Sequence, residues 1–134
     1  MLNQIFSENN EHYIRSIKLN GNENISNEKI LPLLRQKPPN LIFRNPIFDS
    51  RLLKLDALTL KSFYHSKGFL DVNIEESFQK ENDFIDINYK IDEGKRYYLS
   101  LVEVIGNYNI SNDKINDLLG LKTKEPYNPV FIND

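Results

Sequence analysis

Acid–base or metal chemistry in this chain of 134 residues would have to come from two histidines and the carboxylates, because cysteine is absent. His12 and His65 have no serine–histidine–acid arrangement around them, and a cysteine nucleophile is excluded. Four carboxylates lie close enough in sequence to suggest metal ligands: Asp83, Asp86, Asp92 and Glu93. Asp86, however, alternates with apolar residues as in a strand, which favours a solvated face. We therefore expect no catalytic residue, no metal site and no cofactor.

Composition points away from nucleic acid and towards a folded domain. The net charge of −2 is spread along the chain, whereas nucleic-acid binding needs a clustered basic face. The turn at residues 21–24 lacks the second glycine of a Gly-x-x-Gly RNA-binding loop. A hydrophobic content of 40% is enough for a core. No apolar run approaches the roughly 20 residues that cross a bilayer, and no signal-peptide pattern opens the chain.

An internal repeat organises the elements. Residues 17–30 recur as residues 102–115 at a constant offset of 85, with eight of the fourteen positions identical. Such a repeat sets the unit of folding. The sequence therefore predicts a remnant of a preceding copy at 1–8, a complete copy at 13–94 and the first part of a following copy at 97–134. Because a half unit cannot bury its apolar face, we expect residues 98–134 to be less well ordered than 13–94.

The first half of one copy predicts a strand and a short helix. Residues 15–19 alternate polar and apolar side chains, as a half-buried strand does. Gly21 and Asn22, repeated as Gly106 and Asn107, break that strand because both residue types tolerate a positive φ. Ser26 is a suitable N-cap for the helix that follows. Pro32 inside it removes a hydrogen bond, so this helix should be short or kinked.

The second half predicts a long helix and a hairpin. The helix runs from about residue 49 to 67, and Gly68 is suited to a left-handed cap. One helical stripe faces the core: Leu53, Ala57, Leu60 and Tyr64. Alternating runs at 70–78 and 85–91, joined through residues 80–83, indicate an antiparallel pair. The unit is therefore strand–helix–helix–strand–strand.

This order of elements resembles a POTRA (polypeptide-transport-associated) domain, above all those of BamA-type outer-membrane β-barrel assembly factors. The resemblance depends on the following residues, of which the last two belong to the second copy of the repeat: Gly21, Asn22, Ile25, Ser26, Leu53, Asp56, Leu60, Tyr64, Lys67, Gly68, Phe69, Asp71, Asp92, Glu93, Gly94, Gly106 and Asn107. It implies an α+β fold, a three-stranded mixed sheet packed against two helices in tandem units, the last strand central and the second at an edge.

The resemblance also implies a place and partners. The domain would lie at the periplasmic face of the outer membrane, with a barrel outside this chain. Its partners would be unfolded outer-membrane protein clients, assembly accessory proteins and neighbouring POTRA domains. Phe69, where the family usually has tyrosine, and a long 36–50 connection depart from the pattern. A two-partner-secretion or autotransporter-assembly transporter, a plastid import channel and a barrel-less periplasmic adaptor therefore remain alternatives.

Three surfaces are candidate binding sites. An edge strand can accept a client strand by β-augmentation, and its residues would be Leu70, Asp71, Val72, Asn73, Ile74, Glu75 and Glu76. The acidic side chains fit an ordinary, blunted edge equally well. A second surface, Leu41, Ile42 and Phe43, could anchor a partner, but we expect it to fold back over the helices. The third is the short joint between copies: Glu93, Gly94, Tyr97 and Tyr98.

Overall fold

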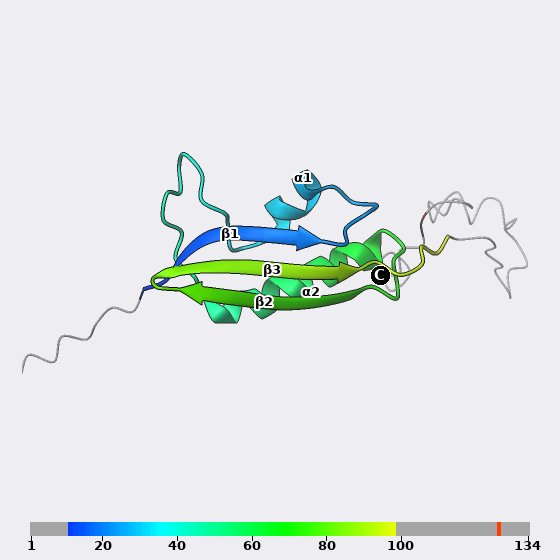
Figure 1. Cartoon of the computed structure of the whole chain (residues 1–134). Coiled ribbons are helices and arrows are strands. Elements are labelled where there is room, and N and C mark those ends of the chain that lie inside the picture. The colour runs from blue at the N-terminus through cyan, green and yellow to red at the C-terminus, as the bar shows by residue number, and fades with distance from the viewer. Residues whose placement is uncertain (1–10, 99–125, 127–134) are drawn as a thin grey trace, which may run out of the picture. The chain divides into compact units, whose positions relative to one another are not determined.

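The computed structural model describes residues 11–98 and residue 126 (Figure 1). The elements in chain order are β1 (Tyr13–Asn20), α1 (Asn27–Ile30), the 3₁₀ helix η1 (Leu31–Leu33), α2 (Ser50–Ser66), β2 (Asn73–Glu81) and β3 (Phe84–Asp92). The described residues form two compact units: 11–60 with 74–92, and 61–73 with 93–98 and 126. The α+β class is confirmed. The remnant expected at 1–8, most of 97–134, Gly106 and Asn107 lie outside the described residues.

The sheet belongs to the first unit and has the order β1-β3-β2. β1 runs parallel to β3, with Ile17 opposite Ile87 and Leu19 opposite Tyr89. β2 runs the other way beside β3 (Figure 1), so the sheet is mixed. Alternate residues of β3 are buried, and its core residues are Ile85, Ile87, Tyr89 and Ile91. The last strand is central, as the resemblance implied, because it alone has a strand on each side.

The first helical segment is as short as its proline predicts. α1 has four residues, and Ser26 occupies its N-cap position without a side-chain capping hydrogen bond. Pro32 falls in η1, where the chain tightens into a three-residue 3₁₀ turn. Ile30 and Leu34 are buried at the two ends of this turn, which keeps it attached to the core.

α2 presents its predicted stripe to the core. Within the first unit Leu53, Ala57 and Leu60 are buried, and residues 50–60 lie along one face of the sheet (Figure 1). The Asp49 carboxylate accepts the Arg51 N–H at 2.9 Å and so satisfies a donor of the first turn. None of the helices in the described part of the chain combines the length and apolarity that crossing a membrane requires.

In the second unit, the end of α2 closes in a Schellman motif. Gly68 has φ +90°, as expected of a left-handed cap. The Phe69 N–H donates to the Tyr64 carbonyl at 3.1 Å, and the Gly68 N–H donates to the His65 carbonyl at 3.0 Å. The Tyr64 and Phe69 rings meet edge to face with centroids 5.6 Å apart. The buried Tyr64 hydroxyl donates to Glu93 Oε1 at 3.0 Å.

The turn after β1 requires glycine at its first position. Gly21 has φ +88°, and a Cβ there would lie 2.0 Å from the Ile91 carbonyl oxygen. The strand ends at Asn20 as predicted, but Asn22 does not adopt a positive φ, so the turn does not use its tolerance of that conformation. Its side-chain amide instead donates to the Ile25 carbonyl at 2.8 Å and to Asn27 Oδ1 at 2.7 Å. Asn22 therefore acts through side-chain hydrogen bonds.

Candidate functional site

β2 is an edge strand, with β3 as its one neighbour among the described strands. It begins at Asn73, three residues later than expected. Leu70 and Asp71 lie in a turn, and Val72 precedes the strand with 3% of its surface exposed. The proposed docking edge is therefore corrected at its start. Four of its seven residues remain on the strand: Asn73, Ile74, Glu75 and Glu76.

The hairpin geometry decides which main-chain groups of β2 face outward. Asn82 and Asp83 form a two-residue connection, and the φ of +53° at Asn82 suits asparagine. Residues that flank such a connection, here Glu81 and Phe84, form a hydrogen-bonded pair. The same register puts Glu75 opposite Lys90, and these two side chains form an ion pair with 3.9 Å between Lys90 Nζ and Glu75 Oε2. We infer that odd-numbered residues of β2 bond to β3.

Even-numbered residues of β2 then direct their N–H and C=O groups away from the sheet. These residues are Ile74, Glu76, Phe78 and Lys80. Their side chains point to the α2 side, where Ile74 is half-buried. Phe78 is 45% exposed although its ring centroid lies 4.8 Å from that of Phe48, so its apolar position in the alternating run does not bury it. Because β2 lies at the edge of the sheet, Phe78 has a described strand, β3, on one side and none on the other.

The opposite edge of the sheet is partly covered. The Ile14 N–H donates to the Pro46 carbonyl, and the Phe48 N–H donates to the His12 carbonyl, both at 2.8 Å. An isolated antiparallel bridge joins Tyr13 to Ile47. The end of the 36–50 connection thus acts as a short strand beside the start of β1. Among the described strands, β1 and β2 both lie at an edge of the sheet, and β1 is covered in this way near its start.

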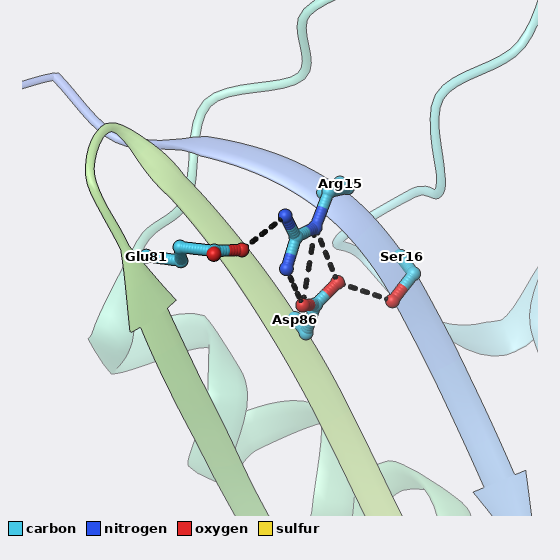
Figure 2. A network of polar contacts seen from close by, with 4 residues as sticks. All are labelled: Arg15, Ser16, Glu81 and Asp86. Carbon is cyan, nitrogen blue, oxygen red and sulfur yellow. Dashed lines mark hydrogen bonds and ion pairs between the residues drawn. The ribbon is translucent and has the colours of Figure 1, made fainter.

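The face of the sheet opposite α2 carries an ionic network (Figure 2) that the sequence did not reveal. Ile14 pairs with Ile85 and Ser16 with Asp86, so Arg15 is the extra residue of a bulge. Its guanidinium bonds the Asp86 carboxylate and also Glu81, the latter at 2.6 Å. The Ser16 hydroxyl donates to Asp86 at 2.6 Å. These bonds, from Arg15 first and Ser16 second, lower the pKa of Asp86 to about 2.

The hydrogen bonds of this network join residues that are 66 to 71 positions apart in the sequence. No local sequence pattern therefore predicts the network. Its one sequence signal was an arginine at a polar position of β1. It ties all three strands together near the hairpin, because Arg15 belongs to β1, Asp86 to β3 and Glu81 to β2. The edge strand is thereby held to the sheet at its end. Within the described residues, no group of three or more histidine, aspartate or glutamate side chains is placed to hold a metal ion.

The apolar residues of the 36–50 connection do not fold back. Leu41 is 95% exposed, Ile42 83% and Phe43 55%, so the expectation that they cover the helices is wrong. The tip is a tight turn: Asn40 Oδ1 accepts the N–H groups of Ile42 and Phe43 at 2.8 and 2.7 Å. Local hydrogen bonding, rather than contact with the core, determines where these side chains lie.

The joint residues gather within the second unit. The Tyr97 N–H donates to the Gly68 carbonyl at 2.8 Å, and its hydroxyl donates to Asp71 Oδ2 at 2.6 Å. That bond raises the pKa of Tyr97. Asp71 therefore fixes the joint rather than the docking edge. Glu93 is buried, and Gly94 has φ +64° beside Asp71.

Arg96 is a joint residue that the sequence analysis missed. Its guanidinium carbon lies 5.4 Å from the ring centroids of both Phe69 and Tyr98. Its Nε donates to the Lys67 carbonyl at 3.0 Å. An arginine next to two tyrosines was the available signal, but the ring of Phe69 lies 27 positions away in sequence. The chain leaving β3 is therefore attached to the loop that follows α2.

Comparison with known proteins identifies the family. A family model for POTRA, described as "Surface antigen variable number repeat", matches residues 12–94. A BamA outer-membrane protein assembly factor from Buchnera aphidicola subsp. Acyrthosiphon pisum (strain APS) is 30% identical over 131 residues, covering 92% of this chain and 21% of the relative. The BamA of Neorickettsia risticii (strain Illinois) is 31% identical over 108 residues, covering 75% of this chain and 15% of the relative.

Solved structures share the fold. Crystallised POTRA domains 3–5 of Haemophilus influenzae BamA superpose with a TM-score of 0.66 at 17% identity, covering 92% of this chain and 51% of that one. The N-terminal domain of Omp85 from Thermosynechococcus elongatus gives a TM-score of 0.51 at 13% identity, covering 92% of this chain and 47% of that one. The chain spans about a fifth or less of the length of the two BamA relatives it matches.

Proposed function

The chain belongs to the POTRA family, and from that premise we propose that it is a periplasmic binding and scaffold module of an outer-membrane protein assembly factor. The names of the BamA relatives support the assembly role. In this proposal the module works by binding and not by catalysis. Its partners are neighbouring POTRA domains, unfolded outer-membrane proteins and assembly accessory proteins, and its place is the periplasmic face of the outer membrane.

The finer proposal is that β2 docks client or accessory-protein strands by β-augmentation. The observation that carries it is the position of β2 at the sheet edge, where β3 is the one strand beside it in the described part of the chain. Strand addition draws its affinity from main-chain hydrogen bonds, which are largely indifferent to the client sequence. Such indifference suits a module that handles many clients. The outward groups that would bond a client belong to Ile74, Glu76, Phe78 and Lys80.

Side chains along β2 suggest what kind of strand would fit. On the α2 side, Ile74 is half-buried and Phe78 is 45% exposed, so an added strand could cover both with apolar residues. On the opposite face Ser77 and Gln79 are polar and exposed. The preferred client strand therefore alternates apolar and polar residues, which is the pattern of strands in outer-membrane barrels.

Proline at an outward position tests the proposal. Glu76→Pro removes one outward N–H, and the hairpin ladder keeps its bonds because Glu76 does not donate to β3 in the inferred register. Glu76→Ala is the matched control, since it removes the same side chain and keeps the N–H. The probe is a synthetic ten-residue peptide of alternating apolar and polar residues, captured by a photo-crosslinking amino acid at Gln79.

We expect Glu76→Pro to reduce cross-linking at least fivefold relative to Glu76→Ala. One lost main-chain hydrogen bond corresponds to about 1 kcal/mol, or about fivefold in affinity. Circular dichroism checks that the fold is intact, and Lys80→Pro provides a second blocked position nearer the hairpin. Equal cross-linking by folded proline and alanine variants at both positions would show that β2 is an ordinary, blunted edge.

A further inference from the structure

The tip of the 36–50 connection exposes three consecutive apolar side chains, Leu41, Ile42 and Phe43. Side chains of this size are normally withdrawn from water, and an exposed contiguous apolar patch marks an interaction site. The connection extends away from the sheet between η1 and α2 (Figure 1). Because the connection protrudes, a binding partner that covers its tip would be a fluid apolar medium or a deep pocket rather than a flat surface.

Part of the backbone of the tip is already satisfied internally. Asn40 Oδ1 accepts two N–H groups, from Ile42 and Phe43, and the Asn40 N–H donates to the Phe43 carbonyl at 2.9 Å. Backbone groups that enter an apolar medium without partners carry a large desolvation cost. This turn lowers that cost before any partner is met. Pro38, Pro39 and Pro46 stiffen the flanking chain, which reduces the conformational entropy lost on docking.

The chain around the tip is mainly basic. Residues 35–49 contain Arg35, Lys37 and Arg44, and their one acidic residue, Asp49, is paired with Arg51 at 2.8 Å, in a chain whose net charge is −2. Arg35 and Arg44 are exposed, and Arg44 makes no ion pair with another described residue. The Lys37 ammonium donates to the Pro32 carbonyl at 2.8 Å, which fixes this charge at the base of the connection. Basic residues that flank an apolar tip complement an anionic surface.

We propose that this tip, residues 41–43, inserts into the interfacial region of an anionic phospholipid bilayer. The apolar side chains enter the boundary between headgroups and acyl chains, while Arg35, Lys37 and Arg44 contact anionic headgroups. A bilayer accepts a protruding tip without a shaped pocket, and the excess of basic over acidic residues around the tip favours anionic phosphate over a generic protein surface. The inference does not depend on strand docking at β2, because it concerns a different surface.

The chain contains no tryptophan, so Phe43→Trp places a single fluorescent reporter at the tip. With vesicles of phosphatidylethanolamine and phosphatidylglycerol, we expect its emission to move to shorter wavelength and to be quenched by brominated acyl chains. Vesicles of phosphatidylcholine should give a weaker response. Phe84→Trp is the matched control, because Phe84 is 44% exposed on β3 and should report no insertion.

Two further variants separate the apolar and the charged contributions. In the Phe43→Trp background, Arg44→Gln should lower partitioning onto anionic vesicles about fivefold, as expected for one basic residue near such a surface. Ile42→Asp should lower it at least tenfold on either kind of vesicle, because a carboxylate replaces an inserting side chain. Raising the salt concentration should reduce the difference between the arginine and glutamine proteins.

Absence of any emission shift on anionic vesicles, with the fold intact by circular dichroism, would overturn the proposal. So would a shift that depends on protein concentration without vesicles, because it would show that the tip docks on a second copy of the chain. A shift that appears only when an accessory or client protein is added would likewise assign the tip to a protein groove. The proline test at Glu76 is unaffected by each of these outcomes.

Discussion

The Arg15–Asp86 contact stabilises the sheet as long as the Asp86 carboxylate is ionised. Arg15 lies in a bulge of β1, and its guanidinium together with the Ser16 hydroxyl holds the Asp86 carboxylate ionised (Figure 2). The pKa of Asp86 is therefore lowered to about 2. A group whose pKa is lower in the folded state stabilises the fold at pH values above its unfolded pKa. This contribution is lost as the pH falls from about 4 through about 2.

We predict that Asp86→Asn lowers stability at pH 7 and flattens its acid dependence. Urea unfolding at pH 7, 4 and 2 should show a difference between the native protein and the variant that changes little from pH 7 to pH 4 and is much smaller at pH 2. Asp83→Asn is the control, because the structure gives the Asp83 side chain no hydrogen bond among the described residues. An acid dependence of Asp86→Asn identical to that of the native protein would show that the Arg15 network does not contribute.

At the scale of elements, the buried carboxylate of Asp56 joins the exit of η1 to α2. Asp56 is fully buried, and its two oxygens accept the Arg35 N–H at 2.8 Å and the Gln36 N–H at 3.1 Å. The Gln36 side chain in turn accepts the Asp49 N–H at 2.9 Å, just before α2 begins. The connection that carries the apolar tip therefore leaves and rejoins the core through fixed hydrogen bonds.

We predict that Asp56→Ala lowers the free energy of unfolding by about 3 kcal/mol, because two main-chain donors lose a charged acceptor. Urea unfolding monitored by circular dichroism measures this change. Lys54→Ala, on the exposed side of the same helix, should alter stability by less than about 0.5 kcal/mol. Comparable effects of the two substitutions would mean that water replaces the carboxylate without cost.

At the scale of the whole molecule, the segment 93–98 leads from the end of the POTRA match at residues 12–94 towards the sequence repeat at residues 102–115. Within the second unit Tyr97 holds this segment through hydrogen bonds to Gly68 and Asp71. The Arg96 guanidinium also stacks on two aromatic rings. A connection bound in this way restricts the direction in which the chain leaves β3. We therefore expect it to behave as a stiff joint and not as a flexible tether.

Hydrogen exchange at the joint checks this expectation. Tyr97→Phe removes the hydroxyl that donates to Asp71, and we predict that exchange of the Tyr97 amide accelerates about fivefold, the equivalent of about 1 kcal/mol. Tyr98→Phe is the control, since it removes a hydroxyl with no hydrogen bond to a described residue. Acceleration of the same size in both variants would show that the Asp71 bond does not hold the joint.

Local residue chemistry determined the elements of this protein. Pro32 shortened the first helix, the stripe from Leu53 to Tyr64 defined the face of α2, and Gly21 and Gly68 marked two turns that need a positive φ. These features depend on neighbours within a few residues, so their spacing in the sequence carries the information. The repeat and the order of elements were enough to indicate the family, and the matching of residues 12–94 confirmed it.

The tertiary structure decided the sites, because they depend on residues far apart in the sequence. Whether Asp71 belonged to β2 or to the joint depended on Tyr97, 26 residues away, and the Arg15 network joins three strands. The sequence did not determine the exposure of the 41–43 tip either, because three consecutive apolar residues form the same pattern whether they are buried or exposed. The Asn40 turn shapes the tip locally, but the pairing of residues 46–48 with the start of β1 depends on the folded chain.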